Sequence, residues 1–208
     1  MIVDLSPENI AEIAYLHQTI LPKSPIPQLG QRFMLKFYYP NLLADAHSGG
    51  ALFYFQQKPI GFISYTANAP RLFREWLWKK GFLLSKQMIL TLIENPQSML
   101  PIGAAILLIS CHSKETQEPI ESEILSFGVL PEYRSLAFYQ KEKIKVANEL
   151  FQYAKSRLKQ FGVKRFKLAT NQSRDYIAPN IFYQNQGMNL LESKTIRGFN
   201  ANIYVGEL

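Results

Sequence analysis

Ten cationic side chains stand against two acidic ones in residues 134–167, so this segment alone carries a net charge of +8. The whole chain of 208 residues has a net charge of +7, which means that the remainder is nearly balanced. A cationic block of this kind raises the local concentration of a polyanion. It favours nucleic acid or a phosphorylated cofactor as a partner, although a solvated helix face followed by a basic loop would carry the same residues. The ten cations are Arg134, Lys141, Lys143, Lys145, Lys155, Arg157, Lys159, Lys164, Arg165 and Lys167.

Histidine and cysteine offer little further chemistry. The three histidines and the single cysteine, which are His17, His47, His112 and Cys111, do not have the spacing of metal ligands. His17 falls on an apolar stripe, where a packed core histidine is expected. One cysteine excludes an intrachain disulfide and fits a reducing compartment. We therefore expect no metal, an inert Cys111 and a cytoplasmic protein.

The composition is that of a folded domain, with 47% hydrophobic and 19% charged residues. The N-terminus lacks the basic and apolar regions of a signal peptide. The most apolar stretch, residues 100–109, is about half the length that a bilayer span needs. We expect no transmembrane helix and a single domain over residues 1–208.

The first half of the chain predicts two helices, a hairpin and a helical insert. Ser6-Pro7-Glu8 is typical of a helix start, and a second helix is expected over 31–39 with Pro40 ending or kinking it. The β-rich runs 51–57 and 60–66 predict a hairpin that turns at Lys58-Pro59. Apolar residues at helical spacing then predict a helical insert over about 70–112.

The second half predicts alternating strands and helices. Strand 123–129 precedes a long amphipathic helix over 141–161 that ends at Gly162, and then a basic strand over 164–170. A helix from Ile177 to Gly187 and strands near 189–196 and 200–206 complete the chain. A strand, a helix and a returning strand imply a parallel crossover, whereas the hairpin implies antiparallel pairing. The fold class is therefore α/β, with a mixed sheet covered by helices on both faces.

Two segments in this order are similar to the core of the GNAT acyltransferases. The first, EILSFGVLPEYR (123–134), is an apolar strand that ends in Val-x-Pro-x-x-Arg. The second, NIFYQNQGM (180–188), follows the helix and the strand and carries a Phe-Tyr pair before a glycine. The helical insert after the hairpin resembles a bacterial GNAT subgroup. The resemblance implies an N-acyltransferase that uses acetyl-CoA as a co-substrate, needs no metal, and acetylates a small-molecule or peptide amine.

The same resemblance implies where acetyl-CoA binds. The pantetheine arm would pair with the backbone of Phe127, Gly128 and Val129, which requires a free strand edge. The pyrophosphate would lie at the N-terminus of the next helix, where unpaired N–H groups favour anions. Family members have Arg/Gln-x-x-Gly-x-Gly/Ala in that loop. Here no glycine follows Arg134 before Gly162. Counting back from Gly162 puts Lys145, Val146 and Ala147 at the glycine positions, and a shifted register uses Lys143 and Lys145 instead.

Tyr183 is the expected catalytic acid by resemblance, because the family's Phe-Tyr tyrosine protonates the departing thiolate and Phe182-Tyr183 matches that pair. Alternatively, Tyr183 is an ordinary buried tyrosine of a helix, with no catalytic role. Glu123, six residues before Val129, matches the base position of the histone-acetylating branch, with Glu121 as a nearby substitute. Asn171, at the end of the basic strand, is a candidate for contacting the cofactor or the acceptor.

The aromatic residues of the insert allow several interpretations. Phe73, Trp76, Trp78 and Phe82 could line a pocket, lie on a membrane surface, form a homodimer contact or simply extend the core. Two further functions compete with catalysis. A degenerate GNAT fold could bind without turnover, as the missing glycines suggest. Alternatively, the 134–167 block could bind nucleic acid or a membrane surface, although no aromatic-basic RNA motif is present and we expect no nucleic-acid partner.

Overall fold

The computed structural model describes residues 1–94, 120–172, 177–196 and 199–208. Seven strands form one mixed sheet in the order β1-β2-β3-β4-β5-β7-β6. Their bounds are β1 Ile2–Asp4, β2 Ser48–Phe55, β3 Lys58–Thr66, β4 Ser122–Val129, β5 Arg165–Asn171, β6 Asn189–Ile196 and β7 Phe199–Glu207. All neighbouring strands run antiparallel except β4 and β5, which are parallel and joined by a helical crossover. The expected mixed sheet and crossover are confirmed.

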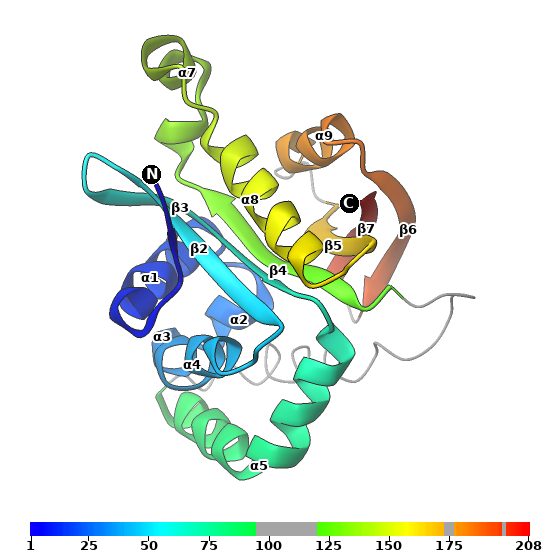
Figure 1. Cartoon of the computed structure of the whole chain (residues 1–208). Helices are drawn as coiled ribbons and strands as arrows, with labels where there is room; N and C mark the ends of the chain where they lie inside the picture. The colour runs from blue at the N-terminus through cyan, green and yellow to red at the C-terminus, as the bar shows by residue number, and fades with distance from the viewer. Residues whose placement is uncertain (95–119, 173–176, 197–198) are drawn as a thin grey trace.

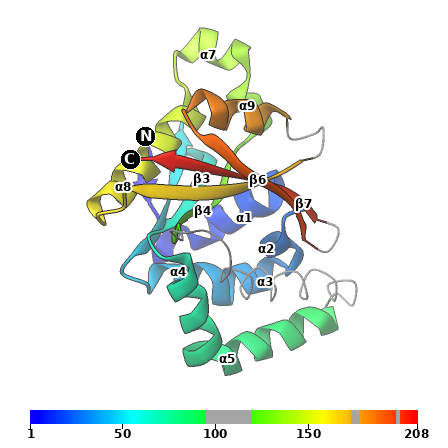
Figure 2. The same cartoon turned by 90° about the vertical axis from the view of Figure 1, so that its right-hand side faces the viewer.

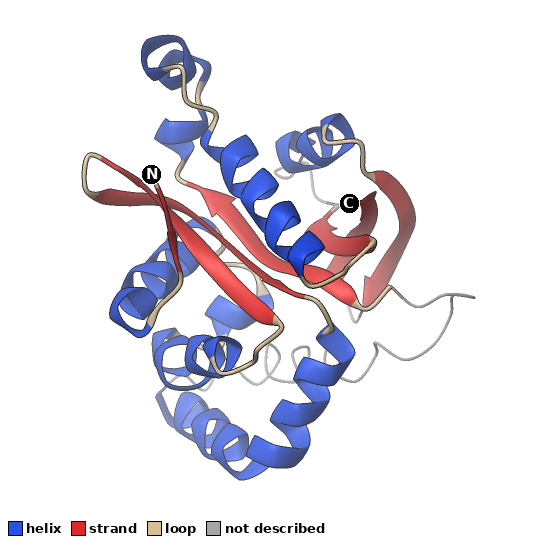
Figure 3. Ribbon diagram, in the orientation of Figure 1, coloured by secondary structure: helices blue, strands red, loops and turns tan. Residues whose placement is uncertain are grey.

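Helices cover both faces of this sheet, as Figures 1 and 3 show. One hydrophobic cluster joins the first helices to one face, and a second joins α8 and α9 to the other. The helices are α1 Ile10–Ile20, α2 Pro25–Gln28, α3 Gln31–Phe33, α4 Tyr39–Leu43, α5 Ala69–Glu94, α7 Leu136–Glu142, α8 Val146–Gln160 and α9 Ile177–Asn185. Among the described residues, no helix is both long and apolar enough to cross a bilayer.

The N-terminal helix begins where the Ser-Pro pair predicts. A 3-10 turn over Pro7–Asn9 leads into α1, and the Asn9 side chain accepts a hydrogen bond from the Ser6 backbone N–H at 2.9 Å. This contact satisfies one of the N–H groups that a helix start leaves unpaired. The Asn9 amide also donates to the Asp4 carbonyl at 2.9 Å, so it ties α1 to the end of β1.

The sequence predicts that the second helix ends or kinks at Pro40. That expectation is wrong about the end of the helix, because the helix continues past Pro40 to Leu43. The helix runs from α3 through a π-helical segment, Met34–Tyr38, into α4, which ends at Leu43. Proline lacks the N–H that a helix interior needs, but the wider π turn places Pro40 in the first turn of α4, where that N–H is not required.

The turn of the β2–β3 hairpin also differs from the expected turn at Lys58-Pro59. Gln56 and Gln57 have positive φ and form the turn, whereas Pro59 lies in β3.

The long helix predicted over 141–161 is two helices. Lys143 adopts a left-handed conformation (φ 58°), and its N–H bonds to the Tyr139 carbonyl at 2.9 Å, which ends α7. Residue Lys145 then precedes the start of α8. Both views show α7 standing away from the sheet at one end of the molecule (Figures 1 and 2). Residues Leu136–Glu142 therefore form a short helix that is separate from α8.

The helical insert is described as far as Glu94. Helix α5 occupies Ala69–Glu94 and is kinked at Lys80, where the backbone angles leave the helical range. Its inner face is anchored to the helices before it, because the Thr91 hydroxyl donates to the Leu29 carbonyl at 3.0 Å and Trp76 is only 3% exposed. The remainder of the predicted insert, including Cys111 and His112, lies outside the described residues.

Candidate active site

The parallel strands β4 and β5 separate after three residue pairs. Ser122, Glu123 and Ile124 lie opposite Phe166, Lys167 and Leu168, respectively. Beyond that point β4 remains paired with β3 as far as Val129, and β5 remains paired with β7 as far as Asn171. In the described part of the chain no strand pairs with the β5-facing side of β4 from Leu125 to Val129. This stretch is a free backbone edge in the middle of the sheet.

Aromatic side chains gather on one face of the sheet beside this free edge. The ring of Phe127 lies 6.1 Å from that of Phe151 on α8, 5.7 Å from that of Phe182 and 6.5 Å from that of Tyr183 on α9, measured between centroids. Helix α9 therefore holds its Phe-Tyr pair against the strand that carries the free edge. Such ring pairs stabilise the fold beyond the area that they bury.

Tyr183 is buried within this group, with 7% of its surface exposed. Burial raises the pKa of its phenol well above the usual value, and the neighbouring Tyr204 adds to the shift. The Tyr183 and Tyr204 rings lie 5.8 Å apart. The phenol is therefore fully protonated at neutral pH and can act as a hydrogen-bond or proton donor.

Glu123 points toward the opposite face of the sheet. Its neighbour Ile124 belongs to the α8-side core, and successive residues of a strand face opposite sides. A β-bulge follows, because Ile124 pairs with Tyr65 and Ser126 pairs with Ser64, which leaves Leu125 as an extra residue. The bulge reverses the alternation, so that Phe127 faces α8 although it lies four residues after Glu123.

A buried tyrosine lies on the Glu123 side of the sheet. Burial is the main cause that raises the pKa of Tyr38 to about 12; the nearby hydroxyls of Ser64 and Ser126 act to lower this pKa, and the charge of Glu123 acts to raise it. Glu123 itself is half-buried. The Glu123 carboxylate is therefore close enough to the Tyr38 hydroxyl to influence it electrostatically. No motif in the sequence indicated that these two residues are neighbours.

No protein-family model matches this chain, and no curated protein matches its sequence. Solved structures do match it over its whole length. An acetyltransferase of the GNAT family from Streptococcus pneumoniae is 12% identical, with 99% of that chain covered and a TM-score of 0.56. An N-acetyltransferase from Staphylococcus aureus Mu50 is 12% identical (97% covered, TM-score 0.57), and Ard1 from Thermoplasma volcanium is 14% identical (97% covered, TM-score 0.57).

The chain has the GNAT fold. The separated parallel strands, with α8 crossing between them and α9 beside them, stand where the GNAT resemblance of the sequence implies a cofactor site. The strand edge of Phe127, Gly128 and Val129 is the free edge described above. Gly128 also allows α1 to approach the sheet, since a Cβ atom there would lie 2.6 Å from the Cγ2 atom of Ile20.

The other predicted cofactor residues, apart from Asn171, lie at or before the start of α8. Helix α8 begins at Val146, so Lys145, Val146 and Ala147 occupy its first turn and the position before it. Lys143 and Arg134 are exposed on the segment that leads into it. The Nζ atom of Lys145 lies 5.0 Å from the centroid of the Tyr139 ring of α7.

Asn171, at the end of β5, lies on the other side of the strand separation. Its carbonyl accepts a hydrogen bond from the Asn180 side chain of α9 at 3.5 Å. Asn180 in turn accepts one from Asn202 of β7 at 3.3 Å. These contacts connect α9 with β5 and β7, so Asn171 helps to hold the helix that carries Tyr183.

Gln186 joins the two helices that flank the free edge, and sequence reasoning missed it. Its Nε2 atom donates to Asn148 Oδ1 of α8 at 3.1 Å, and its Oε1 atom accepts from Gln152 Nε2 at 2.9 Å. The first half of α8 is thereby tied to the end of α9. A lone glutamine before a glycine gives no signal from which such a bridge could be predicted.

The basic block is distributed along α8 and its two flanks, with Lys155 and Arg157 on the helix itself. Lys141, Lys143 and Lys145 lie before α8, whereas Lys159, Lys164 and Arg165 lie at or beyond its far end. Because α8 has 15 residues, the two groups are separated by about 22 Å of helix. The first group is the one next to the predicted cofactor loop.

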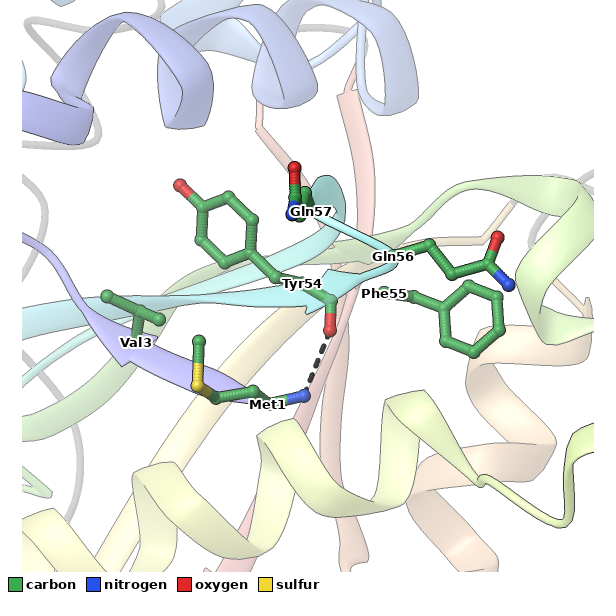
Figure 4. Close-up of a pocket in the computed structure, with 6 residues that line it drawn as sticks. All are labelled: Met1, Val3, Tyr54, Phe55, Gln56 and Gln57. Atoms are coloured by element: carbon green, nitrogen blue, oxygen red, sulfur yellow. Dashed lines mark hydrogen bonds between the residues drawn. The ribbon is translucent and has the colours of Figure 1, made fainter.

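The surface has two hollows, and neither is lined by Tyr183 or Glu123. One is formed at the β1–β2 edge by Met1, Val3, Tyr54, Phe55, Gln56 and Gln57, as Figure 4 shows. The other contains Glu121, whose carboxylate accepts a hydrogen bond from Asn68 at 2.6 Å. Glu121 lies further than Glu123 from the end of the β4–β5 pairing, so Glu123 is the better placed of the two carboxylates. Within the described residues, no group of three or more His, Cys, Asp or Glu side chains could hold a metal.

Proposed function

We propose that the protein is an N-acyltransferase that moves an acetyl group from acetyl-CoA to the amine of a small molecule or peptide. The observation that carries this proposal is the free edge of β4 beside the buried phenol of Tyr183. A free strand edge can pair with the amide groups of the pantetheine arm. A protonated phenol nearby is the group that a departing thiolate needs.

The residues around α8 suit the phosphates of the cofactor. The first N–H groups of a helix have no intrahelical acceptor, and α8 is long enough for its dipole to favour anions at this end. Lys143, Lys145 and Arg134 add positive charge there. Val146 is only 2% exposed and packs into the α8-side core, so its side chain does not cover the helix end. These features support phosphate binding without the usual glycines.

Acetyl-CoA supplies an acetyl group activated as a thioester. In the proposed reaction the amine nitrogen forms a bond to the carbonyl carbon, and the carbon–sulfur bond breaks with its electron pair leaving on sulfur. Tyr183 donates its phenolic proton to that sulfur. The proton lost by the amine passes to Glu123, so that the charges balance.

The two proposed catalytic groups act from opposite faces of the sheet. Tyr183 belongs to the α8–α9 side and Glu123 to the α1 side, so both can serve one reaction only where β4 and β5 are apart. Glu123 lies four residues before Phe127, roughly 13 Å of extended strand. We therefore infer that Glu123 accepts the proton through water rather than by direct contact.

One observation favours a second function, a binding module without turnover. No glycine occurs between Arg134 and Gly162, where the GNAT pattern has Gly-x-Gly/Ala. Every residue at the start of α8 therefore carries a Cβ atom, and close approach of a pyrophosphate to the backbone is harder.

Calorimetry with acetyl-CoA, followed by a CoA-release assay against a panel of amines, tests both functions. The enzyme proposal expects binding in the micromolar to low millimolar range and CoA release that depends on the amine. Binding of acetyl-CoA without CoA release in the presence of any amine would favour the binding module. Absence of binding at millimolar acetyl-CoA would reject both.

A further inference from the structure

Helix α5 presents large apolar side chains to solvent at its kink and along its second half. Trp78 is 84% exposed and Phe82 is 89% exposed, one on each side of the kink at Lys80. Ile89 and Ile93 follow at 58% and 71% exposure, at helical spacing from Phe82. Exposed apolar residues gathered on one element, rather than scattered, indicate an interaction surface.

Within the described residues, these side chains are not part of either hydrophobic cluster. Phe73 and Trp76 turn inward, with Trp76 in edge contact with the rings of Phe37, Tyr38 and Phe73 at 5.6 Å. The Lys80 ammonium group donates to the Asn41 side chain at 2.5 Å and fixes the kink against the body of the protein. The sequence left the role of the four insert aromatics open, and the structure divides them into two that pack and two that project.

Cationic side chains accompany the projecting ones. Lys79 has 70% of its side chain exposed, and Arg74 and Lys86 are also exposed. The carboxylate of Glu75, on the first half of the helix, has Arg71 and Lys79 within 3.4 Å, so it is balanced by cations. The side chains described on α5 therefore combine exposed aromatic and aliphatic groups with a net positive charge.

We propose that the α5 corner, defined as Trp78, Lys79, Phe82, Lys86, Ile89 and Ile93, docks the protein on a membrane surface that contains anionic lipids. Tryptophan and phenylalanine enter the boundary between headgroups and acyl chains, while lysines beside them bind the anionic headgroups. Charge complementarity selects this partner over a second copy of the chain, because two copies would bring the same cations together.

The position of the corner is compatible with such docking. In Figures 1 and 2 the two halves of α5 meet at one end of the molecule, and α7 and α9 lie toward the opposite end. A surface bound at the α5 corner would thus leave the start of α8 and Tyr183 facing away from the lipid. The inference goes beyond the proposed acetyl transfer and does not depend on it.

Sedimentation of the full chain with vesicles tests the proposal. Vesicles of phosphatidylcholine alone are compared with vesicles that contain about 30% phosphatidylserine, at low and high salt. We expect binding only to the anionic vesicles, weakened by salt. Trp78→Ala with Phe82→Ala should weaken it by at least about tenfold. Lys79→Ala with Lys86→Ala should weaken it by about 25-fold, at roughly fivefold for each cation.

Leu136→Ala on α7 is the matched control, because Leu136 is 70% exposed at the other end of the molecule. It should bind as the wild type does. All variants should keep the wild-type melting temperature, since the altered side chains are exposed. Equal binding to neutral vesicles, no binding to either, or binding that the aromatic double variant retains would each overturn the proposal.

Tryptophan fluorescence supplies a second measurement. The chain has two tryptophans, and only Trp78 is exposed, since Trp76 is 3% exposed. Acrylamide should quench Trp78 in free protein, and anionic vesicles should shield it and shift its emission to the blue. Trp78→Phe should abolish that shift. Shielding of Trp78 before vesicles are added would mean that another part of the chain or a second copy covers the corner, and would overturn the proposal.

Discussion

Ile124 of β4 lies opposite Leu168 of β5, and this is the last pair of the parallel ladder between the two strands. After it, β4 follows β3 and β5 follows β7, so the sheet opens from within rather than at its margin. Backbone groups freed in this way need other partners, which makes the opening a natural place for an extended ligand. The proposed acetyl transfer depends on this opening.

Removing the phenol of Tyr183 should slow acetyl transfer. Tyr183→Phe keeps the ring that packs against Phe127 and Phe151, so the fold should survive. We expect a fall in kcat of at least about 100-fold with little change in the affinity for acetyl-CoA. Tyr153→Phe, on α8, serves as the control for loss of a tyrosine hydroxyl elsewhere. Equal rates for Tyr183→Phe and the wild type would contradict the role of this residue.

The pH dependence of the reaction offers an independent check on Tyr183. Burial raises its pKa above the ordinary value of 10.0, so the phenol keeps its proton where a solvated tyrosine would lose it. The rate should therefore not decline through ionisation of Tyr183 up to about pH 10. A decline that begins well below this pH in the wild type and is absent from Tyr183→Phe would show that the phenol ionises earlier than its burial implies.

Glu123 should matter for the amine step but not for cofactor binding. Glu123→Gln keeps the size of the side chain and its place in the ladder between Thr66 and Lys167. We expect kcat with an amine acceptor to fall by about 10 to 100-fold, less than for a base in direct contact, while calorimetry gives an unchanged acetyl-CoA affinity. Glu121→Gln is the matched control, and a larger effect there would reassign the base.

Lys145 should contribute to acetyl-CoA affinity through its charge at the start of α8. Lys145→Ala is expected to weaken binding by about two- to fivefold, the effect of one exposed charge near a helix end. The effect should shrink as salt is added. Lys159→Ala removes the same charge near the other end of α8 and should leave affinity unchanged. If both variants lose affinity equally, the charge acts through the whole domain rather than at this helix end.

His17 should make folding sensitive to mild acid. Its ring is 1% exposed, its Nδ1 atom lies 2.9 Å from the Tyr39 hydroxyl, and burial lowers its pKa to about 3. The unfolded chain takes up a proton below about pH 6.5, whereas the folded chain does so only near the lowered pKa, so stability falls as the pH falls between these values. The expected slope approaches about 1.4 kcal/mol per pH unit.

Urea unfolding at several pH values between about 7.5 and 5 measures that slope. His17→Gln removes the titrating group and should flatten the dependence, whatever its effect on stability at neutral pH. His47→Gln, at an exposed histidine, should keep the wild-type slope. A wild-type free energy of unfolding that does not change with pH over this range would contradict the prediction.

Two glycines should respond in opposite directions to the same change. Gly128→Ala places a Cβ atom 2.6 Å from Ile20 Cγ2 and should cost about 1 to 3 kcal/mol, because α1 must move away from β4. Gly81→Ala meets no atom within 4 Å and lies in α5, so it should stabilise the protein by about 0.5 to 1 kcal/mol. Chemical denaturation gives the free energy of unfolding of the two variants. If Gly128→Ala leaves this free energy unchanged, α1 does not pack closely against β4 at Gly128.

The order of elements was predictable because it depends on local patterns. The stripe of Leu150, Phe151, Ala154 and Leu158 is buried as its helical spacing indicates. The hairpin of β2 and β3 and the closing strands β6 and β7 likewise lie close to their expected bounds. Errors arose where local rules have alternatives, as at Pro40, which a π turn accommodates, and at Lys143, whose left-handed conformation divides one predicted helix into two.

The sequence by itself determined a mixed α/β sheet with helices on both faces, since periodicity follows directly from which side of each element is buried. Only the tertiary structure decided how the candidate site is arranged. Glu123 and Phe127 are four residues apart and would share a face of a regular strand, but the bulge at Leu125 places them on opposite faces. Contacts between distant segments determine whether neighbouring strands stay paired and which side chains a bulge redirects. These contacts produce no periodic pattern in the sequence.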